Sequence, residues 1–112
     1  MKVSRRSTPF GSESRTRVLI LLHLLGSTYA RELSRLLAQP VSVLQKALIS
    51  LERDGLVAAQ TVGRTRLFRL NPGYFARQEF AAYLSKLAET DDTLRRLAAK
   101  IRRRPRRTGK PM

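Results

Sequence analysis

Hydrogen-bonding side chains recur at helical spacing in the stretch 40–54 of this 112-residue chain. Gln45 and Lys46 follow Ser42 by three and four positions, so a helix would bring the three side chains to one face. Ile49 and Arg53 extend that face, and the opposite face carries leucines at the same spacing, Leu44, Leu48 and Leu51. Hydroxyl, carboxamide and ammonium groups can hydrogen-bond to DNA base edges and phosphates. The pattern predicts a helix that presents its polar face to a groove of DNA.

A second candidate contact lies at residues 63–65, between two short segments with strand-like composition. The segments are 56–62, LVAAQTV, and 66–70, RLFRL, and Gly63 supplies the backbone angles of a tight turn. Together they predict a β-hairpin with a basic tip. Arg64 on such a tip can enter the minor groove of DNA, where groove width and A·T content are read. Arg31, near the start of another expected helix, can bind a phosphate.

Four further helices are expected to position these side chains. Apolar residues recur every three or four positions, between residues typical of helix ends, over 13–25, 30–37, 74–88 and 91–103. Ser12 or Ser14 can cap the first of these helices, and Gly26 ends it. The first helix is apolar on nearly every side, which predicts that a second chain covers part of it.

Short polar segments separate the expected helices. Residues 27–29 form a link that can hold one extended residue pair, and residues 38–40 form a turn before the polar helix. Residues 71–73, Asn-Pro-Gly, break the chain after the hairpin. Thr90 and the two acids after it fit a new helix start, so two helices are favoured over one long rod at the end of the chain.

One stretch of the chain, together with the order of the elements, resembles a known family. The segment LLAQPVSVLQKALISLERDGLV (36–57), followed by GRTRLFRL (63–70), is similar to winged helix-turn-helix regulators of the ArsR/MarR type. In that family a leucine-spaced recognition helix ends in a Leu-Glu-x-x-Gly-Leu-Val motif, which residues 51–57 match. The resemblance covers about residues 16–70 and implies a mainly α fold with a small β-hairpin wing.

The resemblance implies a set of groove-facing residues and a set of wing residues. They are Pro40, Val41, Ser42, Gln45 and Lys46 on the helix, and Arg64, Thr65 and Arg66 on the wing. The chemistry agrees for Gln45, which can bind adenine through two hydrogen bonds, and for Lys46, which can bind guanine or a phosphate. Metal-sensing members of the family use Cys, or His with carboxylates. This chain has no Cys and one His, so no metal site and no cofactor are expected.

The net charge of +15 predicts a polyanionic partner, with nucleic acid favoured over an anionic membrane surface. The excess is concentrated at the ends, with five Lys and Arg residues among the first 17 positions and nine among the last 18. The absence of Cys excludes disulfides, and no apolar run reaches the length that spans a membrane. A cytoplasmic, nucleoid-associated protein is therefore expected.

These patterns predict a single folded domain with basic ends. The expected organisation is a flexible basic arm over 1–12, a winged helix-turn-helix DNA-binding domain over 13–72, C-terminal dimerisation helices over 73–103 and a disordered basic tail over 104–112. The expected function is a homodimeric, sequence-specific transcriptional regulator of double-stranded DNA, most simply a repressor. Two alternatives stay open: a nucleoid-associated architectural binder that ignores DNA sequence, and a winged-helix protein-interaction module.

Other reactive residue types have structural interpretations. His23 lies in an apolar helix and is expected to pack there or against a dimer partner rather than to sense pH. Asp91 and Asp92 fit a helix start better than a metal or catalytic pair. The aromatic residues at helical spacing after residue 73 are expected in the core or a dimer interface rather than as a base-stacking platform. Nucleophilic or acid–base groups do not converge, so no enzyme is expected.

Overall fold

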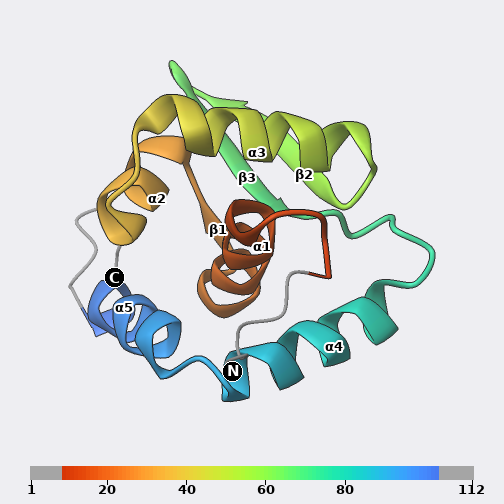
Figure 1. Cartoon of the computed structure of the whole chain (residues 1–112). Coiled ribbons are helices and arrows are strands. Elements are labelled where there is room, and N and C mark those ends of the chain that lie inside the picture. Colours follow the sequence, from red (N-terminus) through yellow and green to blue (C-terminus); the bar gives the residue numbers. More distant parts are fainter. Residues whose placement is uncertain (1–8, 104–112) are drawn as a thin grey trace, which may run out of the picture.

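Helix α1 (Glu13–Leu25) is the element around which the rest of the chain folds (Figure 1). The computed structural model describes residues 9–103. The Ser12 side chain accepts a hydrogen bond of 3.1 Å from the Arg15 backbone N–H and caps α1, as predicted. Gly26 ends the helix with a φ of 89°, a backbone conformation that glycine adopts without steric cost. The predicted bounds of this helix are confirmed.

The apolar surface of α1 is covered by the rest of the same chain. Val18, Leu19, Leu21 and Leu22 are fully buried within the protomer. Helix α3 (Val41–Arg53) lies on one side of α1, and helices α4 (Arg77–Glu89) and α5 (Asp92–Arg103) lie on the other (Figure 1). The expectation that a second chain must cover α1 is therefore wrong. The sequence pattern indicates how much of a helix is buried, but it does not indicate which segment buries it.

Helix α2 (Ala30–Leu37) and α3 are joined by a tight turn over residues 38–40. Ala38 adopts a left-handed conformation with a φ of 55°, and the Ser34 hydroxyl donates to the Gln39 carbonyl at 2.6 Å. Pro40 stands just before α3, and its carbonyl accepts from the Val43 and Leu44 N–H groups at 3.0 and 3.4 Å. Proline needs no hydrogen-bond partner for its nitrogen at this position, so the turn and the helix start are compatible.

The three strands form one antiparallel sheet in the order β1-β3-β2. The strands are β1 (Ser27–Thr28), β2 (Val57–Val62) and β3 (Thr65–Leu70). The hairpin turn has only two central residues, Gly63 and Arg64, so Thr65 belongs to the strand and pairs with Val62 rather than lying in the turn. Only the first central residue has a positive φ, 64° at Gly63, as in type II′ hairpins.

The chain after the hairpin forms two helices, as predicted. Helix α4 begins at Arg77 rather than at residue 74, because residues 71–76 form successive turns in which Tyr74 N–H donates to the Asn71 carbonyl at 3.2 Å. The Asp91 side chain accepts from the Leu94 N–H at 3.0 Å and caps α5, so the acid after Thr90 is the capping residue. The buried positions of these helices belong to the core of the protomer: Leu84, Ala88, Leu94 and Ala98.

The described part of the chain is a mainly helical domain of five helices and a three-stranded antiparallel sheet, consistent with the mainly α fold and hairpin that were predicted. None of these helices is long and apolar enough to cross a bilayer. The predicted arm over 1–12 is wrong for residues 9–12, because Phe10 packs on Phe80 and Tyr83 with ring centroids 5.7 and 5.9 Å apart. Residues 1–8 and the predicted tail over 104–112 lie outside the described range.

Candidate nucleic-acid interface

The outward face of α3 carries one continuous stripe of exposed side chains. The stripe comprises Ser42, Gln45, Lys46, Ile49 and Arg53, and all five are exposed. The inward face of the helix is apolar and buried through Leu44, Ala47, Leu48 and Leu51. Because the inward face is fixed in the core, the stripe is held on a rigid support and faces solvent. The exposure expected of these five residues is therefore observed, and we call them the α3 stripe.

The other predicted contacts lie beside the start of this helix. Pro40 is exposed and Val41 is half-buried, so Pro40 alone of the pair is fully open to a partner. Arg31 is exposed in the first turn of α2 and forms no ion pair with any described residue. Arg31 lies on α2, which packs against α3.

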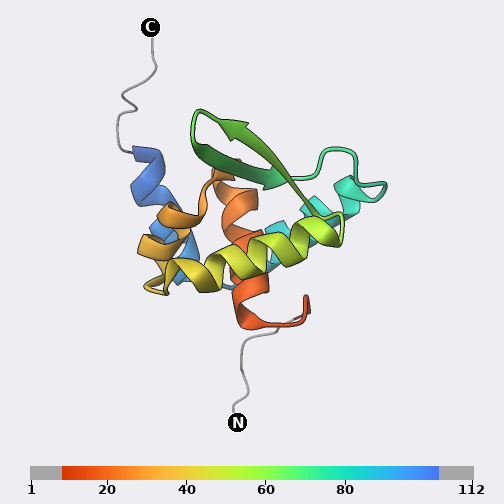
Figure 2. The ribbon, with the colours of Figure 1, turned by 90° about the horizontal axis from the view of Figure 1, so that it is seen from above.

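The hairpin tip lies on the same side of the molecule as the α3 stripe. In Figure 1 the tip rises past α3, and the view from above in Figure 2 shows the hairpin running back along the helix, so that its tip lies beside the N-terminal half of α3. Gly63, Arg64 and Thr65 are exposed. The helix face and the hairpin tip therefore form one surface that a single extended partner can contact.

Arg66 is exposed but tied to α3 by contacts that the sequence analysis missed. Its guanidinium lies 3.1 Å from Glu52 Oε2, and its carbon Cζ lies 5.3 Å from the centre of the Phe68 ring. Glu52 is in the last turn of α3 and Arg66 is in β3, so the ion pair ties the hairpin to the helix. Arg66 was predicted as a wing-tip contact with DNA, and here its charge is partly engaged by Glu52.

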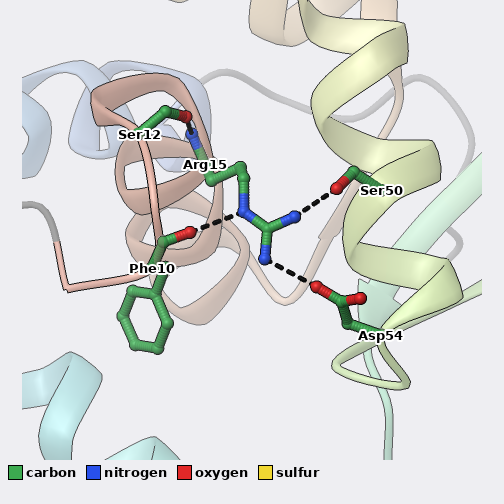
Figure 3. Close-up of polar contacts among 5 residues, drawn as sticks. All are labelled: Phe10, Ser12, Arg15, Ser50 and Asp54. Carbon is green, nitrogen blue, oxygen red and sulfur yellow. Dashed lines mark hydrogen bonds and ion pairs between the residues drawn. The ribbon is translucent and has the colours of Figure 1, made fainter.

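Arg15 makes a second tie, between the start of α1 and the end of α3 (Figure 3). Its Nε donates to the Phe10 carbonyl at 2.6 Å, its Nη2 contacts Asp54 Oδ2 at 2.7 Å, and its Nη1 donates to the Ser50 hydroxyl. The side chain of Arg15 is only 20% exposed. The sequence analysis did not find this residue, because its partners on α3 lie 35 and 39 positions away and no local pattern links them.

The Leu-Glu-x-x-Gly-Leu-Val motif ends α3 and turns the chain into β2. Gly55 has a φ of 82°, its N–H donates to the Glu52 carbonyl at 3.0 Å, and the Leu56 N–H donates to the Leu51 carbonyl at 3.0 Å. These two bonds are those of a Schellman motif. Asn71 closes the junction, since its Nδ2 donates to the Gly55 carbonyl at 2.8 Å. The motif therefore sets the angle at which the hairpin leaves the helix.

The charge of α2, α3 and the hairpin is positive because their cations outnumber their acids. Glu32 accepts a hydrogen bond of 2.6 Å from the Thr28 hydroxyl, Glu52 pairs with Arg66, and Asp54 pairs with Arg15. The cations on α2, α3 and the hairpin that form no ion pair with a described residue are Arg31, Arg35, Lys46, Arg53, Arg64 and Arg69. All six are exposed. The surface is therefore suited to an extended anion.

Features that would indicate other chemistry are small or missing in the described range. No group of three His, Cys, Asp or Glu residues between positions 9 and 103 could hold a metal ion. His23 is half-buried in the last turn of α1. A pocket of about 130 Å³ lies between α2 and α5 and is lined largely by leucines, among them Leu36 and Leu97. It is smaller than the roughly 300–1,000 Å³ typical of small-molecule sites.

Comparison of the chain with protein-family models, with curated proteins and with solved structures found no match. The features that bear on function are therefore the α3 stripe, the hairpin tip and the cations around them that form no ion pair with a described residue.

Proposed function

We propose that the protein is a winged helix-turn-helix transcriptional regulator that binds double-stranded DNA. In this proposal α3 enters the major groove and the hairpin tip contacts the adjacent minor groove or the DNA backbone. The observation that carries the proposal is that the α3 stripe is exposed and lies on the same surface as the hairpin tip. An α-helix fits the width of the major groove, and a basic hairpin beside it would extend the contact along the duplex.

Each exposed residue has a role that its chemistry supports. Gln45 would bind adenine through two hydrogen bonds, and Lys46 would bind guanine or a phosphate. Ser42, in the first turn of the helix, would contact a phosphate or a base edge. These roles would supply sequence preference at a small number of base pairs.

The cations outside the α3 stripe would bind the DNA backbone and the minor groove. Arg64 at the hairpin tip would enter the minor groove, with Thr65 beside it, and Arg31 would bind a phosphate from the opposite side of α3. Arg66, one strand pair from the hairpin turn, would offer less of its charge to DNA, since Glu52 already pairs with its guanidinium. Affinity would come largely from phosphates, so binding would weaken steeply with salt.

The proposal includes a homodimer formed through an aromatic surface around the start of α4. We call this the aromatic surface; its rings are Phe10, Tyr74, Phe75, Phe80 and Tyr83. Phe75 is 91% exposed, although a phenylalanine side chain gains strongly from burial. Helix α4 carries the Lys86–Glu89 pair rather than excess charge, so two copies could approach there without the repulsion that the basic face would cause. A two-fold dimer would place two copies of α3 on a symmetric site, about one helical turn apart.

The alternatives are separated by one competition titration. Duplexes selected by the wild-type protein from a random pool are titrated against random duplexes of the same length and composition. A preference of roughly a hundredfold or more supports the regulator. Tight binding with no preference would favour the architectural binder, and no binding at moderate salt would favour the protein-interaction module. A regulator of this kind acts at the nucleoid and needs no catalytic group.

A further inference from the structure

Ile49 occupies the middle of the α3 stripe. It is 48% exposed and lies seven positions after Ser42, which is about two turns of helix, so the two side chains point the same way. Gln45 and Lys46 flank this line, and Arg53 continues it by one further turn. The centre of the proposed DNA-binding face is therefore an apolar, β-branched side chain surrounded by hydrogen-bonding and charged groups.

The stability of α3 gives no reason for an isoleucine at this position. The buried contacts of the helix are made by other residues, among them Leu48 and Leu51. An exposed isoleucine is a poorer helix former than Ala, Leu, Lys or Gln, because its branched side chain loses rotamer freedom against the preceding turn. Ile49 also lacks large apolar neighbours on the stripe, whereas the core of a protein–protein interface gathers several such residues.

The groups that the α3 stripe presents have counterparts in the major groove of DNA. The base edges there offer hydrogen-bond donors and acceptors and one kind of apolar group, the 5-methyl group of thymine. This inference rests on the proposed function. We propose that Ile49 reads a thymine by packing on its methyl group, and that together with Gln45 it gives α3 a preference for A·T base pairs. Gln45 supplies the complementary contact, since its carboxamide matches adenine N6 and N7.

The spacing of the two residues predicts where the thymine lies. Four residues of helix rise about 6 Å, which corresponds to about two base pairs at 3.4 Å per pair. The thymine read by Ile49 is therefore expected within about two base pairs of the adenine read by Gln45.

A thymine-to-uracil scan tests this proposal. Uracil pairs as thymine does and lacks only the 5-methyl group. Each thymine in the duplex selected by the wild-type protein is replaced in turn, and the dissociation constant is measured for wild type, Ile49→Ala and Ile49→Val. We expect one position per half-site at which uracil weakens wild-type binding about fourfold, the loss expected for one methyl-sized apolar contact.

The decisive comparison is between the uracil penalties of wild type and of the two Ile49 variants. In Ile49→Ala the uracil penalty at that position should disappear, and in Ile49→Val, which keeps a branched apolar side chain, most of it should remain. A flat scan with the wild-type protein, or a penalty that is unchanged in Ile49→Ala, would overturn the role of Ile49 while leaving the regulator intact. If the wild-type protein selects no site at all, the proposed function fails first and this inference fails with it.

Discussion

The two outer layers of the molecule use their charges differently. On the side of α2, α3 and the hairpin, acids are engaged by internal partners and six cations stay exposed without an ion pair to a described residue. On the side of α4 and α5, Lys86 pairs with Glu89 and Arg95 pairs with Asp92, so fewer described cations are left without an ion pair, namely Arg77, Arg96 and Lys100, and the ring of Phe75 is almost fully exposed. The total charge of the chain says little about where a polyanion binds. Whether each cation forms an ion pair is more informative, because the partner acid partly neutralises the charge that a polyanion would otherwise meet.

The largest effect on DNA affinity is expected from reversing one charge on α3, with the reversal of one charge on α4 as its control. Lys46→Glu, on the α3 stripe, should weaken DNA binding about thirtyfold at physiological salt, since two units of phosphate attraction are lost, and should reduce the salt dependence accordingly. Lys86→Glu is the matched control on α4 and should change affinity less than twofold. Equal losses for the two variants, measured by fluorescence anisotropy across a salt series, would remove the distinction between the two layers.

The aromatic surface provides the second comparison. Phe75→Ser should weaken self-association about tenfold or more, because a phenylalanine that becomes buried in an interface contributes about 1.5–3 kcal/mol. The stability of the protomer should change little, since the side chain is 91% exposed. Sedimentation velocity over a concentration series, together with thermal unfolding, measures both quantities. An unchanged sedimentation profile would overturn the proposed dimer through this surface.

Arg15 and Arg17 offer a matched pair of tests within α1. Both arginines form an ion pair, but Arg15 bonds to three groups and links α1 to α3, whereas Arg17 pairs with Glu13 one turn away. Arg15→Met should lower the free energy of unfolding by about 1–2 kcal/mol. Arg17→Met should lower it by about 0.5 kcal/mol or less, as is usual for an exposed pair at this spacing. The midpoints of denaturant unfolding should therefore differ between the two variants. Coincident unfolding curves would show that the link from Arg15 to α3 does not stabilise the fold.

The smallest effect is expected at the ion pair between the hairpin and α3. Glu52→Gln should lower the free energy of unfolding by less than about 1 kcal/mol, because both partners are partly exposed. The variant should bind DNA slightly more tightly, since a negative charge is lost and Arg66 is released. A clear loss of affinity would instead indicate that the main contribution of Glu52 is to hold the wing at its angle.

The sequence was sufficient to predict the helix bounds and helix faces that depend on local signals. The bounds of α1 follow from a capping serine, a terminal glycine and apolar spacing, and those of α2 follow from apolar spacing between short polar links. The break between α4 and α5 was predicted for the same reason, since Asp91 caps the helix that begins directly after it. The outward face of α3 was also predictable, because the leucine spacing of one face determines the other.

The sequence was insufficient where structure depends on contacts between distant segments. The link between Arg15 and Asp54, and the pair between Glu52 and Arg66, join residues that no periodic pattern relates. The same limit explains why the covering of α1 was assigned to a second chain, when α4 and α5 of the same chain supply it. The packing of Phe10 on Phe80 is a further example, in a segment whose composition resembles a flexible arm.

The central claim is that the front of α3 contacts DNA bases, and it is tested most directly by selecting duplexes from a random pool with wild-type protein and with Gln45→Ala. We expect the wild-type protein to enrich a two-fold symmetric sequence that contains an A·T pair in each half-site. We expect Gln45→Ala to enrich the same sequence with that one pair no longer specified, because only the contact to adenine has been removed. Identical enriched sequences from the two proteins, or no enrichment by the wild-type protein, would contradict the account.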